Sequence, residues 1–151
     1  MKLTTYSDYA LRVMMYLAVH DDRRSTIAEI AEAYDISRNH LMKLVQDLAR
    51  AGLVESTRGR SGGLKLGRDA GKIRVGQVIR LTESDIDLVE CFSPGSNTCR
   101  ITPACQLNFV LREALGQFLS VLDRYTIADL ISNRDTLKAL LEPEAPVISE
   151  Q

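Results

Sequence analysis

The sequence predicts a mainly α protein with a small β-hairpin wing: a winged helix-turn-helix followed by a long helix. Three observations support this fold class. Two helical patterns flank a tight break at residues 35–37, a basic hairpin follows, and the longest helical periodicity runs from 104 to 124. Helix, helix, tight break, helix and basic hairpin is the element order of a winged helix-turn-helix.

The first two helices have different sequence signals. Apolar residues recur at helical spacing from Asp8 to about His20, which predicts the first helix there. After a polar break, Thr26 and Glu29 have the spacing of a capping box, in which each side chain bonds the other residue's backbone N–H. A second helix should therefore start at about residue 27.

The third helix follows the break Asp35-Ile36-Ser37, and the Ser37 hydroxyl can cap it. Its apolar residues form one stripe: Leu41, Leu44, Val45, Leu48 and Ala49. Because this stripe must face the core, the polar residues on the other side are free to meet DNA. Gly52 stands where a left-handed residue ends a helix.

A change to extended periodicity then predicts a hairpin, with strands at 53–57 and 64–66 around a turn at 58–63. Between Arg58 and Arg80 the chain has seven lysines and arginines against a single acidic residue, Asp69. Residues 1–80 carry 14 basic and 9 acidic side chains, whereas residues 81–151 carry 5 and 11. The basic block suggests a polyanion-facing surface, and a solvated arginine-rich loop is the alternative.

The second half of the chain alternates between helical and irregular segments. A helix at 76–84 precedes an irregular stretch at 85–103, and the long helix runs from Ala104 to Arg124. Thr126 can cap a short helix, and 137–141 adds a last turn or two. We therefore divide the chain into a DNA-binding domain at 1–83, a cysteine-bearing loop at 84–103, helices at 104–141, and a disordered acidic tail at 142–151.

Length and composition exclude several classes of protein. The 151 residues, 45% hydrophobic and 26% charged, make one ordinary domain or a small domain with an appendage. The chain lacks an apolar run of about 18 residues and begins with no signal-peptide pattern. We therefore expect a cytoplasmic protein with no membrane partner. No nucleophile–base arrangement or nucleotide-binding loop stands out, so we expect no enzyme.

Two segments supply candidate DNA contacts. In a helix-turn-helix, the first residues of the second helix reach base edges in the major groove. The candidates there are Ser37, Arg38, Asn39, His40 and Lys43. The hairpin offers cations for phosphates or a narrow minor groove, namely Arg58, Arg60 and Lys65. A polar first turn that binds nothing is the alternative for the helix.

Cys91, Cys99 and Cys105 are the only cysteines, and an odd number makes a poor disulfide framework. Thiolates favour zinc, copper(I) or an iron–sulfur cluster. The close ligand pairs of structural zinc are absent, and neither histidine is near. Three cysteines leave a cluster one ligand short. The helix start at Cys105 favours its thiolate, and three ordinary buried thiols are the alternative.

Several stretches of the chain carry a family resemblance. They are Leu3–Arg12, Ile36–Lys43, Arg50–Gly52, Arg58–Leu66, Ile101–Cys105 and Leu122–Leu130. Together they resemble the bacterial winged-helix regulators that carry iron–sulfur clusters, and within that family the nitric-oxide-sensing repressors. The resemblance covers about residues 1–131, and the cysteine loop with the helix after it is its most diagnostic part.

The resemblance implies a homodimer joined through the helix from Ala104 to Arg124. It also implies one four-iron four-sulfur cluster per subunit on the three cysteines, with Asp8 of the other subunit as fourth ligand. An acid favoured by the dipole of its own helix is the alternative for Asp8. A sister branch with a two-iron cluster has a histidine where this chain has Asn108, so the resemblance argues against that branch.

We therefore expect a cytoplasmic repressor dimer that binds a pseudo-palindromic operator in double-stranded DNA. Nitric oxide would react with the cluster and release the DNA. One rival is an iron–sulfur-status or redox-sensing regulator of the same family. The others are a cofactor-free thiol switch and a small iron–sulfur electron-transfer protein, which would need neither a base-reading helix nor a basic wing.

Overall fold

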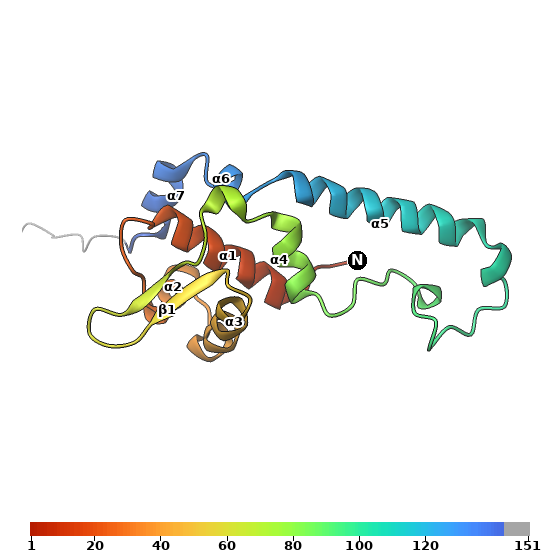
Figure 1. Ribbon diagram of the computed structural model, residues 1–151, viewed down its shortest axis with the longest axis horizontal. Helices are drawn as coiled ribbons and strands as arrows, with labels where there is room; N and C mark the ends of the chain where they lie inside the picture. The colour runs from red at the N-terminus through yellow and green to blue at the C-terminus, as the bar shows by residue number, and fades with distance from the viewer. Residues whose placement is uncertain (144–151) are drawn as a thin grey trace, which may run out of the picture.

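Helix α1 (Thr5–Val19) lies at the centre of the fold in the computed structural model, which describes residues 1–143 (Figure 1). The helix begins three residues before the predicted Asp8. Thr4 caps it, because the Thr4 Oγ1 accepts the N–H of Ser7 at 3.2 Å. Ala10, Val13 and Met14 are fully buried, so the middle of the helix lies within the hydrophobic core.

Helices α2 (Ile27–Tyr34) and α3 (Arg38–Arg50) form the predicted helix-turn-helix. The capping box of Thr26 and Glu29 is present with both of its hydrogen bonds. Asp35 ends α2 in the left-handed conformation, at φ 52°, and Ile36 donates its N–H back to Ala31 at 2.9 Å. This tight turn fixes the direction in which α3 leaves α2.

The predicted cap at Ser37 is wrong in one respect. Ser37 occupies the N-cap position of α3, but its side chain makes no capping hydrogen bond. Its hydroxyl is exposed at the start of the helix and is left for another partner. At the other end, Gly52 has the predicted left-handed conformation, with φ +76°.

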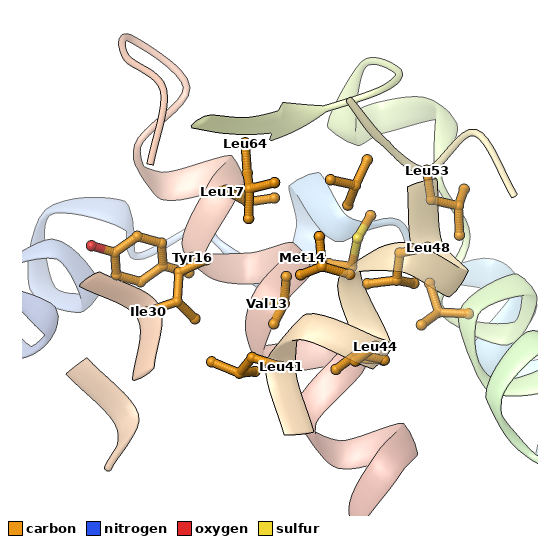
Figure 2. Close-up of a cluster of buried hydrophobic side chains, with 14 of the residues drawn as sticks. Val13, Met14, Tyr16, Leu17, Ile30, Leu41, Leu44, Leu48, Leu53 and Leu64 are labelled. Carbon is orange, nitrogen blue, oxygen red and sulfur yellow. The ribbon is translucent and has the colours of Figure 1, made fainter. Parts of the chain in front are cut away.

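The core lies between α1, α2, α3 and the hairpin (Figure 2). Apolar side chains from all four elements meet there: Val13, Met14, Leu17, Ile30, Leu41, Leu44, Leu48, Leu53 and Leu64. Each fully buried leucine contributes about 1.5–3 kcal/mol relative to an exposed one. The predicted stripe of α3 faces this core, which leaves the opposite face of α3 in solvent.

The wing is a two-stranded antiparallel hairpin of β1 (Val54–Thr57) and β2 (Gly63–Leu66). Leu64 also exchanges backbone hydrogen bonds with Ser25, at 3.0 and 2.7 Å. Gly63 is needed at this crossing, because a Cβ there would lie 2.9 Å from the Ser25 carbonyl oxygen and the residue has φ +140°. The wing is thus anchored to the loop between α1 and α2.

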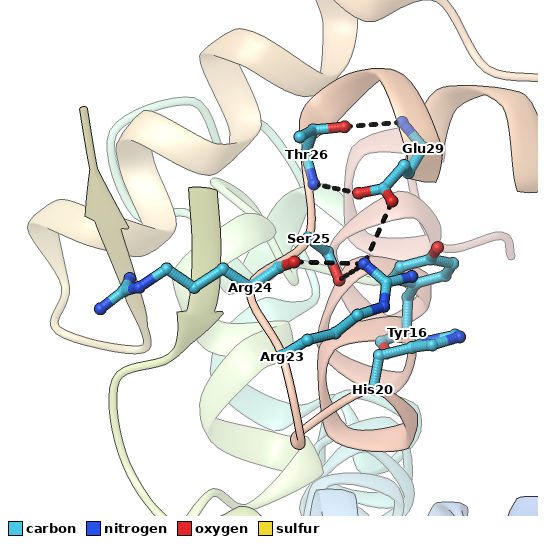
Figure 3. Close-up of polar contacts among 7 residues, drawn as sticks. All are labelled: Tyr16, His20, Arg23, Arg24, Ser25, Thr26 and Glu29. Atoms are coloured by element: carbon cyan, nitrogen blue, oxygen red, sulfur yellow. Dashed lines mark hydrogen bonds and ion pairs between the residues drawn. The ribbon is translucent and has the colours of Figure 1, made fainter. Parts of the chain in front are cut away.

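Arg23 holds that loop in shape (Figure 3). Its guanidinium donates to Glu29 and to the Arg24 carbonyl, both at 3.1 Å, and lies beside Ser25. Behind it, His20 stacks on Tyr16 with ring centroids 4.3 Å apart. These contacts join the end of α1 to the start of α2 and support the strand crossing at Ser25.

The remaining elements carry the chain away from the helix-turn-helix and back. They are η1 (Ala70–Lys72), α4 (Val75–Thr82), η2 (Glu90–Phe92), η3 (Thr102–Ala104), α5 (Gln106–Arg124), α6 (Ile127–Leu130) and α7 (Arg134–Leu141). Helix α5 begins two residues after the predicted start, and α7 is longer than the predicted last turn. The predicted tail at 142–151 lies outside the described residues except for Glu142 and Pro143.

Helix α5 projects from the rest of the chain as an arm (Figure 1). At its base, the Arg80 guanidinium on α4 donates two hydrogen bonds to the Asp123 carboxylate, at 2.5 and 2.7 Å. A Cβ at Gly76 would lie 1.9 Å from the same carboxylate, so a larger residue there would push the Asp123 side chain out of this pair. None of the helices described within residues 1–143 has the length and apolarity to cross a membrane.

Candidate DNA-binding surface and cysteine loop

The first turn of α3 presents the polar side chains predicted to meet DNA. All five of them are exposed: Ser37, Arg38, Asn39, His40 and Lys43. Leu41 and Leu44, from the same turns of the helix, are 0% and 1% exposed and point into the core. The helix therefore separates its base-reading candidates from its core residues, as a recognition helix must.

The tip of the wing carries Arg58 and Arg60, and both are exposed. Neither forms an ion pair within the part of the chain that the structure describes. Their charges are therefore available to a phosphate backbone. Gly59 lies between them with φ +103°, which only glycine adopts without strain and which lets the turn reverse sharply.

Lys65 stands in different surroundings from the two arginines. It is half-buried in β2 opposite Glu55, away from the tip. A hydrogen bond from Arg134 is the main reason that the pKa of Asp21 is lowered, and the charge of Lys65 adds to it. Arg24 and Lys65 lower the pKa of Glu55 in the same way. Because Lys65 is half-buried and stands away from the tip, we expect it to contribute less to DNA binding than the two arginines.

The first turn of α1 connects the recognition helix to the start of the cysteine loop. Tyr6 donates a hydrogen bond to Asp47 of α3, which together with burial of the ring raises the pKa of Tyr6 to about 12. On the other side, Glu83 at the end of α4 accepts from the Thr4 N–H at 2.8 Å and from the Ser7 hydroxyl at 2.5 Å. Sequence reasoning missed these contacts, because each joins residues more than 40 positions apart.

The loop that carries the cysteines runs to the outer end of α5 (Figure 1). Cys91 lies in η2 and Cys105 is the N-cap residue of α5, and all three thiols are free and half-buried. Between them, Thr102 donates to the Cys99 carbonyl at 2.8 Å and Asn97 accepts the Cys99 N–H at 3.0 Å. The sequence alone did not indicate these turns.

The cysteine loop does not form a preassembled metal site. Among residues 1–143, no three histidine, cysteine or acidic side chains are grouped closely enough to hold a metal ion. The donor chemistry nevertheless fits an iron–sulfur cluster, since three free thiols lie within 15 residues of the chain, in the loop before α5 and at its N-cap, and that stretch contains no histidine. A cluster with four ligand positions would need one more donor, which is not a cysteine of this chain.

Asp8, the residue that the resemblance implies as that donor, lies in the first turn of α1. Its carboxylate is half-exposed and pairs with Arg12 at 2.8 Å. Helix α1 belongs to the globular part of the chain, whereas the cysteines lie at the outer end of the arm (Figure 1). Asp8 is therefore not brought together with the cysteines of its own chain.

The outer half of α5 exposes apolar side chains. Leu107 is 61% exposed, Phe109 65% and Val110 54%, and no residue of this 19-residue helix is buried. Leu115 and Phe118, nearer the base, are half-buried and line a hollow with Met1 and Leu3 of the same chain. Helix α5 thus has an inner part that packs on its own subunit and an outer part whose apolar side chains are open.

Comparison with known proteins identifies close relatives. Residues 3–133 match the Rrf2 family, described as iron-dependent transcriptional regulators. The HTH-type transcriptional regulator NsrR of Bacillus subtilis is 49% identical over 143 residues, which cover 94% of this chain and 98% of that protein.

Two solved structures resemble the fold over nearly its whole length. The structure of T. potens IscR has a TM-score of 0.72 at 28% identity, covering 95% of this chain and 93% of that one. The structure of CymR, the global cysteine regulator of B. subtilis, has a TM-score of 0.67 at 31% identity, covering 88% and 98%. The predicted fold class, a winged helix-turn-helix with a long helix, is therefore confirmed.

Proposed function

The chain belongs to the Rrf2 family of transcriptional regulators, and we propose that it is a cytoplasmic repressor whose DNA binding is controlled by nitric oxide acting on an iron–sulfur cluster. Its relatives and structural neighbours are transcriptional regulators, which confirms the expectation that it is no enzyme. One observation carries the proposal: a loop with three half-buried thiols runs to the outer end of a long helix that projects from a winged helix-turn-helix.

The three cysteines would hold one four-iron four-sulfur cluster in each subunit. When bound, the cluster supplies iron atoms that react with nitric oxide. Cys91, Cys99 and Cys105 would supply three ligands, and Asp8 of the partner subunit the fourth. The half-exposed carboxylate of Asp8 supports this assignment, because it is accessible to a second chain. A hard oxygen donor is poorly matched to iron in such a cluster compared with thiolate, so this ligand should exchange most readily.

The open apolar residues on the outer half of α5 support a homodimer. Leu107, Phe109 and Val110 would be buried against a second copy, as large exposed apolar patches usually are. A two-fold symmetric dimer places two copies of α3 in successive major grooves, so the operator should be pseudo-palindromic. A ligand from one subunit on the cluster of the other would fix their relative orientation and hence the spacing of the two half-sites.

The contacts of the first turn of α1 support coupling between the two sites. The turn that carries Asp8 makes two further contacts. Its Tyr6 donates a hydrogen bond to Asp47 of the recognition helix. Its Ser7 donates a hydrogen bond to Glu83, just before the cysteine loop. Loss of the Asp8 ligand would free this turn to shift and take α3 with it. A difference of about 3 kcal/mol between the two states changes operator affinity by roughly 150-fold.

The proposal is tested with protein purified without oxygen. An operator is first selected from a random duplex library, and its affinity is then measured for the protein before and after nitric oxide. Native mass spectrometry and the absorption spectrum should give four irons and four sulfides per subunit, and nitric oxide should weaken binding. A two-iron cluster would favour the iron–sulfur-status regulator, and binding that ignores nitric oxide would rule out the proposed signal.

Variants then separate the ligands. Replacing any one cysteine with alanine should prevent stable cluster assembly. Asp8→Ala should still assemble the cluster but change its spectrum and weaken the coupling of nitric oxide to DNA release. Asp22→Ala, at another exposed aspartate, is the matched control. If Asp8→Ala matches the control in spectrum, nitric oxide response and affinity, Asp8 is only a helix-start acid.

A further inference from the structure

Asn108, in the first turn of α5, contacts a cysteine sulfur. Its Nδ2 donates a hydrogen bond to the Cys91 Sγ at 2.9 Å. Asn108 and Cys91 are 17 positions apart in the sequence, so the contact depends on how the loop folds back on the helix. It ties η2, which carries Cys91, to the same helix turn that follows Cys105.

Arg112 decides which end of the Asn108 side chain faces the sulfur. The Arg112 Nε donates to the Asn108 Oδ1 at 3.0 Å, which leaves the amide NH₂ to face Cys91. Arg112 is itself held in place, because its guanidinium lies 4.3 Å from the centre of the Phe92 ring, and Phe92 is only 8% exposed. Asn108 is therefore presented to Cys91 as a donor and not as an acceptor.

An N–H donor on a cysteine ligand changes the cluster that the cysteine holds. The hydrogen bond draws electron density from the sulfur, so the thiolate donates less to iron and the cluster accepts an electron more readily. Hydrogen bonds to sulfur are among the features that set the reduction potential of iron–sulfur proteins. Groups around the ligands also orient them. Arg112 adds a positive charge beside Cys91, 3.5 Å from its carbonyl oxygen, which acts in the same direction.

We propose that Asn108, oriented by Arg112, is a positioning residue for the Cys91 sulfur that raises the reduction potential of the bound cluster. This inference rests on the proposed cluster but not on Asp8 or on nitric oxide as the signal. It also gives Asn108 a role that is distinct from metal ligation: the side chain donates to a ligand sulfur and does not itself bind iron.

The first test uses the cluster-loaded protein. Asn108→Ala removes the donor, and Asn108→Asp replaces it with a group that, when ionised, can only accept. The potential, measured by spectroelectrochemistry, should fall in Asn108→Ala and fall further in Asn108→Asp. The iron–cysteine stretching bands in the resonance Raman spectrum should move to higher frequency. Gln106→Ala, at an exposed residue of the same helical turn, is the control and should match wild type. Alanine favours helix, so these alanine variants should fold.

The second test needs no cluster. In apoprotein labelled with ¹⁵N, the side-chain NH₂ resonances of Asn108 should differ from those of an exposed asparagine. Cys91→Ala should move them to the exposed position, whereas Cys99→Ala should leave them in place. This measurement reports the contact itself, even for a variant that cannot assemble a cluster.

The outcomes separate this inference from the proposed function. If wild-type protein holds no cluster, the proposed function fails, and the inference fails with it even if resonance data show the contact. If wild-type protein holds a cluster but Asn108→Ala has the same potential and Raman bands as Gln106→Ala, the inference is overturned while the proposed function stands. Asn108 resonances that do not respond to Cys91→Ala would also overturn it.

Discussion

The wing gives the sharpest quantitative prediction, because Arg58 and Arg60 are exposed cations without an ion-pair partner in the described chain. A protein that neutralises phosphates of duplex DNA releases counterions, and each phosphate contributes about 0.9 to the slope of log affinity against log salt. If each arginine meets one phosphate, the double variant Arg58→Ala/Arg60→Ala should lose about 1.8 from the slope per subunit.

The proposed dimer would bring two wings to the DNA, so the total change in slope should be about 3.6. Between 50 and 200 mM salt, wild-type affinity should then fall about 150-fold more than that of the double variant, since a fourfold change in salt is raised to that power. Fluorescence anisotropy with a labelled operator at four or five salt concentrations measures both slopes. Lys65→Ala should change the slope less than either single arginine variant, because Lys65 is half-buried and lies away from the tip of the wing.

The control removes two cations elsewhere. Arg124→Ala/Lys138→Ala lowers the net charge equally but changes α5 and α7 and not the wing. It should leave the slope close to that of wild type. Equal slopes for wild type and the Arg58→Ala/Arg60→Ala variant would remove the wing from the interface. Equal losses in the wing variant and the control would show that net charge alone, and not the position of the wing, sets the salt dependence.

Three further predictions concern the recognition helix, the arm and the start of α1. Ala at Arg38 or Asn39 should change base preference by about 1–3 kcal/mol at one operator position, measured with single-base operator variants. Unchanged selectivity in both would refute the recognition-helix assignment. Val110→Asp places a charge on the open part of α5 and should give monomers in sedimentation velocity, so a folded dimer would contradict the dimer interface. Burial of Glu83 raises its pKa, but hydrogen bonds from Ser7 and Thr4 outweigh this effect and lower the pKa from 4.5. The carboxylate therefore stabilises the fold above about pH 4.5, and this contribution is lost as pH falls through the lower folded-state pKa. Glu83→Gln should flatten the loss of stability in acid, measured by urea unfolding at several pH values, and an unchanged pH dependence would argue against the contact.

The sequence by itself determined the elements whose causes are local. The capping boxes that begin at Thr26 and Thr126 each join two residues three positions apart, and both are present. The stripe on α3 needed only the helical period, and the left-handed Gly52 needed only its place after a helix. The hairpin followed from its alternating strands and its glycine-rich turn. Signals of this kind act over a few residues and can be read without knowing what packs on them.

Only the tertiary structure decided the contacts between segments that are far apart in the sequence. In the structure α1 begins at Thr5, and its N-cap residue Thr4 donates a hydrogen bond to Glu83, 79 positions away in the sequence. The structure also showed that Gly76 admits the Arg80–Asp123 pair and that Asn108 faces the Cys91 sulfur. Neither contact has a sequence signal, because each depends on the angle and distance at which separate segments meet. Residue spacing along the chain fixes a helix face, but only packing fixes which distant side chain that face will touch.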